Sequence, residues 1–349
     1  MSNQLKKLLL LLLYYSCVRK KNRQNGLTVL TYHKIADEPD IQDSLKVSKA
    51  TFESQIIYLK KYYTILSGDQ LADILMRGDA YPDNSCLITF DDGWLDNYTN
   101  AFPILKKHEV PAVIFISTDF IGTNNTFWHE NLGEYLSKLD PETLKELKKG
   151  NPFPRDIQDE LDIIVKIPQR SRGKQIAKVT ELFKSYSPDD IESYLIRIGS
   201  VFGIHDTERK PSVLSWEQIE VMTKQNIAFG SHTKSHRILT NVSIHDVERE
   251  LSESKSIIET KTGRKVYFVA YPNGNYNEQI VDKAKGLGYL AGFTCEAGEN
   301  AYCDNPFTMK RKHIHEIMSQ NIFGNYSDKY FKAELSGIRT SVKNIILSF

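Results

Sequence analysis

Short apolar runs alternate with segments of helical periodicity along much of the chain. The first runs, which we expect to be buried strands, cover residues 27–32, 86–90 and 112–117. After the first run, Ser48 is placed to cap a helix whose apolar face carries Phe52, Ile56 and Leu59. A further helix is expected at residues 96–108. This repetition of strand and helix predicts βα units.

A polar, helix-rich segment interrupts the alternation between residues 122 and 213. Two of its helices are marked by a cap residue followed by a first-turn proline, at Asp140-Pro141 and at Ser187-Pro188. Its many charged positions are typical of solvated helical faces. We interpret the segment as an insertion on one loop, placed to act as a lid on the substrate side.

The alternation resumes at Ser215, whose spacing to Gln218 predicts a capping box. We expect strands at residues 227–230, 267–271 and 289–294, and helices at residues 243–263 and 277–287. About seven strands separated by helices favour a parallel (β/α) barrel of the α/β class over an open sheet. The functional loops of such a barrel gather at the strand C-termini. Several polar residues follow predicted strands there: His33, Asp91, Asp92, His232 and Asn273.

Five segments are expected along the chain. Residues 27–121 and 214–316 would form the two parts of the barrel, with residues 122–213 as the helical insertion. Residues 1–26 would form a basic and apolar N-terminal helix, and residues 317–349 a C-terminal extension.

Six consecutive leucines at residues 8–13 lie between two basic clusters. The run is too short to span a bilayer, which needs about 20 apolar residues. The basic cluster that follows, and the lack of a small-residue cleavage site, oppose export. We expect residues 4–23 to contact a membrane surface peripherally from the cytoplasm. A helix packed on the domain is the alternative, and export stays open.

Composition excludes several classes of function. The formal net charge is +1, from 45 Lys and Arg against 44 Asp and Glu, so no whole-protein field would recruit nucleic acid. The four cysteines show no C-x-x-C spacing, which disfavours a thiolate zinc site and a disulfide scaffold. The oligomeric state is left open.

Candidate chemistry begins with Thr89-Phe90-Asp91-Asp92-Gly93, which ends a predicted strand. Two adjacent carboxylates repel one another and are costly to bury, so they need a compensating charge. A metal ion is the simplest candidate. The alternative is a turn in which the two aspartates cap the next helix.

A second motif, His232-Thr233-Lys234-Ser235-His236, places two imidazoles four residues apart. On a helical turn or in a tight loop, such a pair can bind one ion, although surface histidines remain the alternative. With one aspartate, the pair would suit zinc hydrolysis or non-haem iron oxygenation. The spare carboxylate favours hydrolysis, because a hydrolase needs a general base.

Together these two motifs resemble the polysaccharide deacetylases, carbohydrate esterase family four, and the resemblance covers roughly residues 27–314. It implies a distorted (β/α) barrel and a divalent metal, with zinc the expected ion. It also implies that Asp91 is the general base. The implied metal ligands are Asp92, His232 and His236.

The third segment, residues 270–276, is similar to a proline-containing family motif. There a backbone N–H helps to hold the oxyanion, and Asn273 is the matching position. Ala270 stands where many members carry an arginine that orients the base. Arg311 is a candidate substitute, and a solvated basic cluster with its two lysine neighbours is the alternative.

A general acid is expected from histidine. Leu30-Thr31-Tyr32-His33 resembles the early Tyr-His of a subgroup that acts on biofilm and surface polysaccharides, which implies His33 as proton donor. His313 is the second candidate, with His315 close by. The family's tryptophan-bearing motif is not evident.

The resemblance implies a metal-dependent hydrolase that removes N-acetyl groups from amino sugars of a polysaccharide or its glycan precursor. An N-acetylated glycan is then the expected partner. A metal-dependent amidase of the same fold acting on a small non-sugar amide, and an inactive carbohydrate-binding relative, are the alternatives. An iron oxygenase is the weakest one.

Overall fold

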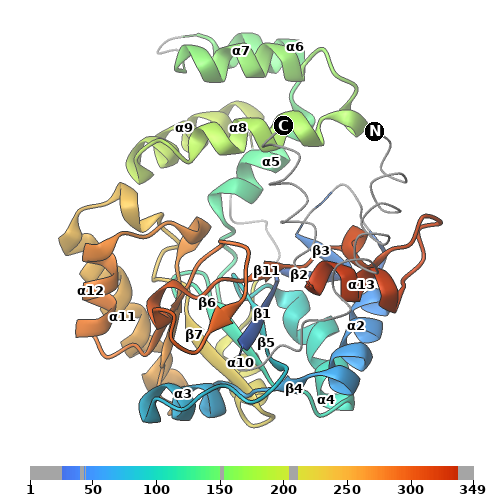
Figure 1. Cartoon of the computed structure of the whole chain (residues 1–349). Coiled ribbons are helices and arrows are strands. Elements are labelled where there is room, and N and C mark those ends of the chain that lie inside the picture. Colours follow the sequence, from blue (N-terminus) through green and yellow to red (C-terminus); the bar gives the residue numbers. More distant parts are fainter. Residues whose placement is uncertain (1–25, 40–42, 44, 150–152, 204–210, 337–349) are drawn as a thin grey trace, which may run out of the picture.

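A curled, mainly parallel sheet forms the centre of the molecule in the computed structural model, which describes residues 26–39, 43, 45–149, 153–203 and 211–336 (Figure 1). Its strand order is β10-β1-β5-β6-β7-β8-β9, with β11 beside β1 and β4 beside β5. Neighbours from β1 to β9 run parallel, and β10 is antiparallel to β1. The α/β fold with a distorted barrel is therefore confirmed.

The strands are short, and most of them deliver a loop to the same end of the sheet. Their bounds are β1 Gly26–Tyr32, β4 Thr64–Ile65, β5 Ser85–Phe90, β6 Ala112–Ile116, β7 Ile227–Ser231, β8 Phe268–Ala270, β9 Ala291–Phe293, β10 Asn300–Ala301 and β11 Lys312–His313. A separate parallel pair consists of β2 Lys34–Ala36 and β3 Lys46–Ser48.

Both faces of the sheet are covered, which explains why its strands read as continuous apolar runs. Every residue of β5 and β6 is buried. Successive side chains of a strand point to opposite faces. Accordingly, Leu30 and Ile88 belong to one apolar cluster, whereas Val29, Leu87 and Val113 belong to another.

Helices cover the outside of the sheet (Figure 1). They are α2 Lys49–Tyr62, α4 Phe102–Lys107, α10 Trp216–Thr223, α11 Ile244–Thr262, α12 Glu278–Gly286 and α13 Asp328–Leu335. Helix α3, Gly68–Arg77, instead packs on the other face, where Leu71 and Ala72 join the apolar cluster of Val29 and Leu87. The predicted caps are present: Ser48 caps α2, Ser215 and Gln218 form a capping box, and Gly263 ends α11 in the left-handed conformation.

Five further helices form a layer above the sheet, next to the strand C-termini (Figure 1). They are α5 Trp128–Lys138, α6 Pro141–Leu147, α7 Arg155–Ile164, α8 Gly173–Phe183 and α9 Pro188–Phe202. Their buried side chains form an apolar core of their own, including Leu136, Leu161, Val179 and Ile198. Asp140 and Ser187 cap α6 and α9, as their sequence signals predict. A role as a lid stays a prediction.

The helix predicted at residues 96–108 is present, but it is not regular throughout. A π-helical turn, Asn97–Ala101, comes first, and α4 follows. Pro103 lacks the N–H that a regular helix would donate to the Thr99 carbonyl, so the ladder cannot run through unchanged. The strands predicted at residues 267–271 and 289–294 are also shorter than expected, because the chain turns away after Ala270 and Phe293.

The predicted N-terminal helix at residues 1–26, with its membrane contact at residues 4–23, lies almost wholly outside the described residues; only Gly26 is described, and it begins β1. Among the helices that are described, none combines the length and the apolar character needed to cross a bilayer. The part of the C-terminal extension that is described includes α13, which packs on α2 through Phe331 and Tyr58, with ring centroids 5.4 Å apart.

Candidate metal centre and active site

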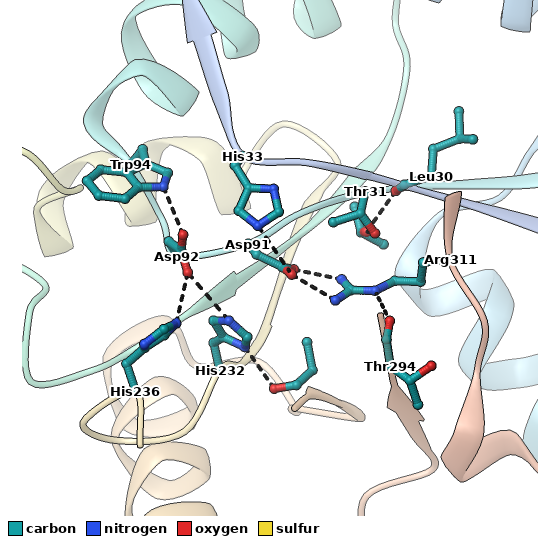
Figure 2. Close-up of polar contacts among 12 residues, drawn as sticks. Leu30, Thr31, His33, Asp91, Asp92, Trp94, His232, His236, Thr294 and Arg311 are labelled. Atoms are coloured by element: carbon teal, nitrogen blue, oxygen red, sulfur yellow. Dashed lines mark hydrogen bonds and ion pairs between the residues drawn. The ribbon is translucent and has the colours of Figure 1, made fainter. Parts of the chain in front are cut away.

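Three side chains from two strand ends converge on one point (Figure 2). Oδ1 of Asp92, after β5, lies 3.4 Å from Nε2 of His232 and 3.2 Å from Nε2 of His236. The three potential ligand atoms all lie within 4.8 Å of one another. The structure therefore brings together all three residues that the resemblance names as metal ligands.

Left-handed backbone conformations make this convergence possible. Asp92 has φ 74° and Gly93 has φ 70°, so the chain turns sharply at the end of β5. At Gly93 a Cβ would lie only 2.8 Å from Cγ2 of Ile116, so only glycine fits. Thr233 and His236, at φ 65° and 57°, bend the loop after β7 back toward the carboxylate. The two histidines meet through a tight loop rather than a helical turn.

Hydrogen bonds orient the donor atoms. Nδ1 of His232 lies 2.8 Å from the Ala270 carbonyl, so Nδ1–H donates there and the Nε2 lone pair faces Asp92. The Trp94 indole N–H donates to Oδ2 of Asp92 at 3.0 Å and leaves Oδ1 toward the histidines. Two imidazole nitrogens and one carboxylate oxygen that face one another fit a divalent metal with open coordination positions.

The charges of this cluster also indicate a metal site. Burial raises the pKa of Asp92, but hydrogen bonds from His232 and His236 outweigh it and hold that pKa well below its usual value. Burial alone would lower the pKa of His232, whereas contact with Asp92 and Asp91 raises it overall. The cluster thus attracts positive charge, and a metal ion would replace the histidine proton because ligating imidazole must be neutral.

Asp91 is buried and points away from the three donors, toward Arg311 (Figure 2). The guanidinium donates to both carboxylate oxygens, at 2.7 and 2.8 Å, and its Nε–H donates to the Thr294 carbonyl at 2.8 Å. Burial raises the pKa of Asp91, but the Arg311 charge and its hydrogen bonds lower it overall. Asp91 is therefore an ionised carboxylate at neutral pH.

Arg311 is only 2% exposed, which excludes the solvated basic cluster left open by the sequence. It stands directly before β11, which pairs with the end of β1. Ala270, at the usual position of the family's arginine, ends β8 instead. The guanidinium therefore reaches Asp91 from the residue before β11 and not from the end of β8.

His33 lies close to Asp91, and His313 packs on His33. Nε2 of His33 is 4.0 Å from Oδ2 of Asp91, and its ring centroid is 5.1 Å from that of His313. Burial lowers the pKa of His33 to about 4, against the attraction of Asp92, so this imidazole is neutral at pH 7. His313 itself is exposed. His315 lies further out, with its ring 6.3 Å from that of His313.

Asn273 lies on the turn that follows β8, three residues after the carbonyl that binds His232. It has φ 58°, and the next residue, Gly274, has φ 76°. A Cβ at Gly274 would lie 2.5 Å from the Cys295 backbone N, so this turn is tightly packed. Its position beside the site is compatible with the oxyanion role, which stays a prediction.

Two residues of the site were missed by the sequence reasoning. Trp94 lies two residues after Asp92 in the sequence, and its indole N–H donates to the Asp92 carboxylate. Its place directly after Gly93 was a signal from which this contact could have been predicted. His129, on α5, packs on Phe127 and lies 5.8 Å from the His236 ring. Burial lowers the pKa of His129 to about 3. No sequence signal marked it, because it belongs to the inserted helices.

Known proteins are similar to this chain in sequence. The protein YxkH of Bacillus subtilis (strain 168) is 24% identical over 310 residues, which is 88% of this chain and 78% of that protein. The poly-β-1,6-N-acetyl-D-glucosamine N-deacetylase of Staphylococcus aureus (strain N315) is 30% identical over 142 residues. That match spans 37% of this chain and only 46% of the staphylococcal enzyme.

Solved structures share the fold. The Streptococcus pyogenes deacetylase PplD, in complex with acetate, superposes with a TM-score of 0.57 at 18% identity and covers 89% of this chain and 98% of its own. IcaB from Ammonifex degensii gives 0.52 at 20% identity, covering 83% and 92%. The sequence model of the polysaccharide deacetylase family matches residues 78–153 and 178–292, more than half of the chain. The chain belongs to the polysaccharide deacetylase family.

Proposed function

We propose that this protein is a metal-dependent N-deacetylase that removes acetyl groups from N-acetylated amino sugars of a polysaccharide or its glycan precursor. The observation that carries the proposal is the pair of neighbouring carboxylates with different partners. Asp92 faces two histidines, and Asp91 faces Arg311. One aspartate is thus arranged as a ligand and the other as a base. The family, and the activity of the staphylococcal relative, support the same substrate class.

Asp92, His232 and His236 would hold the metal. Two imidazole nitrogens and one carboxylate with open positions suit a catalytic Zn²⁺, which we propose as the native ion. A divalent metal there supplies Lewis acidity, which acidifies a water molecule and polarises a carbonyl oxygen.

Asp91 would remove the proton from the water that attacks the acetamide carbonyl. Arg311 holds both oxygens of this carboxylate in place, and it keeps the carboxylate ionised before the attack. The backbone N–H of Asn273 would donate to the oxyanion that develops on the carbonyl oxygen.

His33 would carry the proton to the departing amine. At 4.0 Å from Asp91 it is within reach through one water molecule, and its neutral state at rest lets it accept the proton that Asp91 has taken up. His313, 5.1 Å from His33 between ring centroids, is the second candidate for this role. The products are acetate and a free amino sugar.

A substrate larger than a small amide is favoured by the surroundings of His236. This side chain also lines a cavity of about 700 Å³ beneath the inserted helices. A small non-sugar amide would leave most of that cavity unfilled.

Acetate release tests the proposal. The purified protein, supplied with zinc, is incubated with N-acetylglucosamine oligomers and, in parallel, with small cyclic and linear amides. We expect acetate from the sugars and no hydrolysis of the small amides. Binding of the oligomers without any acetate release would instead support an inactive carbohydrate-binding protein.

A further inference from the structure

A cavity of about 700 Å³ lies between the inserted helices and the loops that follow β6 and β7. This volume is within the range of small-molecule binding sites, roughly 300–1,000 Å³. His236 belongs both to the lining of the cavity and to the three-donor cluster, so the cavity adjoins the proposed catalytic centre. A substrate held at that centre can extend past His236 toward the cavity.

The wall of the cavity changes character from one side to the other. The loops after β6 and β7 contribute mainly polar side chains, among them Asp119, Ser235 and Asn241. Helix α9 contributes the branched aliphatic side chains Ile191, Leu195 and Ile196 from one face, with Glu192 and Ser200 beside them. Ile196 is 66% exposed, which is unusual for so large an apolar side chain. The cavity is thus polar on the loop side, which carries His236, and mainly aliphatic along α9.

We propose that this cavity binds a hydrocarbon chain attached to the N-acetylated sugar, so that the substrate is an amphiphile. The proposal rests on the proposed deacetylase function. The sugar lies at the catalytic centre, and the chain lies along α9. Burial of a hydrocarbon against branched aliphatic side chains is favourable. Sugar hydroxyls placed against the same three side chains would lose water without gaining hydrogen bonds, which is costly.

A chain-length series tests this directly. Acetate release is measured for methyl, butyl and octyl glycosides of N-acetylglucosamine, and for N-acetylglucosamine oligomers of increasing length. We expect kcat/KM to rise about two- to fourfold for each methylene that enters the cavity. A rise with the number of sugar residues and none with the alkyl chain would overturn the proposal, because the cavity would then hold glycan.

A matched pair of variants locates the effect. Ile196→Asn places a polar group on the cavity wall, and Ile163→Asn makes the same change at a 41% exposed position on α7, away from the cavity. We expect Ile196→Asn to flatten the dependence of kcat/KM on alkyl length and Ile163→Asn to leave it as in the wild type. Thermal unfolding of both variants shows that each is folded.

The outcomes separate the two proposals. Two results would contradict the hydrocarbon site but not the deacetylase function. One is acetate release that does not depend on alkyl length, and the other is a dependence of kcat/KM on alkyl length that Ile196→Asn leaves unchanged. Absence of acetate release from every N-acetylated sugar in the series, with or without an alkyl chain, removes both.

Discussion

Asp91 and Arg311 are joined by two charge-assisted hydrogen bonds although 220 positions separate them in the sequence. The pair is buried, and Arg311 is fixed in turn by the Thr294 carbonyl. A bidentate guanidinium fixes both the position and the charge of a carboxylate. In this chain the proposed base is therefore oriented by the residue directly before β11, and Ala270 on β8 does not contact it through its side chain.

Replacement of the proposed base should separate metal binding from turnover. Asp91→Asn keeps the size of the side chain and leaves Asp92, His232 and His236 untouched. We expect a normal metal content and a loss of roughly 10²- to 10⁴-fold in kcat, which is the usual contribution of a general base. Elemental analysis and acetate release check the two parts. Undiminished turnover would remove Asp91 from the role proposed for it.

Arg311→Lys should move the acidic limb of the pH–rate profile to higher pH. The fold lowers the pKa of Asp91, so the base is active above that lowered value and inactive below it. Lysine cannot donate in the fork geometry of arginine, so the pKa of Asp91 should rise. The profile of kcat/KM against pH measures the shift.

A suitable control is Arg249→Lys, because Arg249 pairs with Asp246 on the exposed surface of α11. Its profile should match that of the wild type. An unchanged acidic limb in Arg311→Lys would show that the guanidinium does not set the ionisation of the base.

Trp94→Phe should weaken metal binding while preserving an aromatic side chain. The indole N–H donates to the Asp92 oxygen that faces away from the histidines, and phenylalanine has no such donor. Loss of a hydrogen bond to a ligating carboxylate typically costs about 10- to 100-fold in metal affinity or activity. Competition with a chromogenic chelator measures the affinity. Trp216→Phe, on α10 away from the site, should leave it unchanged.

His33 and His313 should differ in their effect on turnover. His33 is 4.0 Å from Asp91, whereas His313 is exposed and packs on His33. We expect His33→Gln to lower kcat by roughly 10²-fold or more, the usual scale for a proton-transfer group, with metal content intact. The effect of His313→Gln should be smaller. The reverse order in acetate-release rates would assign proton delivery to His313.

Much of this arrangement follows from local sequence. The apolar run before Asp91 predicts a buried strand, and parallel strands bring their C-terminal ends together, so Asp92 and His232 were expected to meet. Left-handed turns at these strand ends could not be predicted, because Asp92, Thr233 and His236 are not glycine. The tertiary contacts of the metal site impose these conformations.

Other parts of the site have no local signal. Arg311 precedes a strand of only two residues, Lys312–His313, which shows no apolar run or alternation. His129 reaches the site only because the inserted helices pack over the strand ends, a long-range contact. The cavity along α9 likewise depends on how two separate layers meet.

Anomalous diffraction from crystals grown with zinc tests the central claim most directly. The account predicts one strong anomalous peak, which marks a zinc ion at about 2.0–2.2 Å from Oδ1 of Asp92, Nε2 of His232 and Nε2 of His236. Zinc bound elsewhere on the chain, with these three atoms unliganded in an enzyme that still releases acetate, would contradict it.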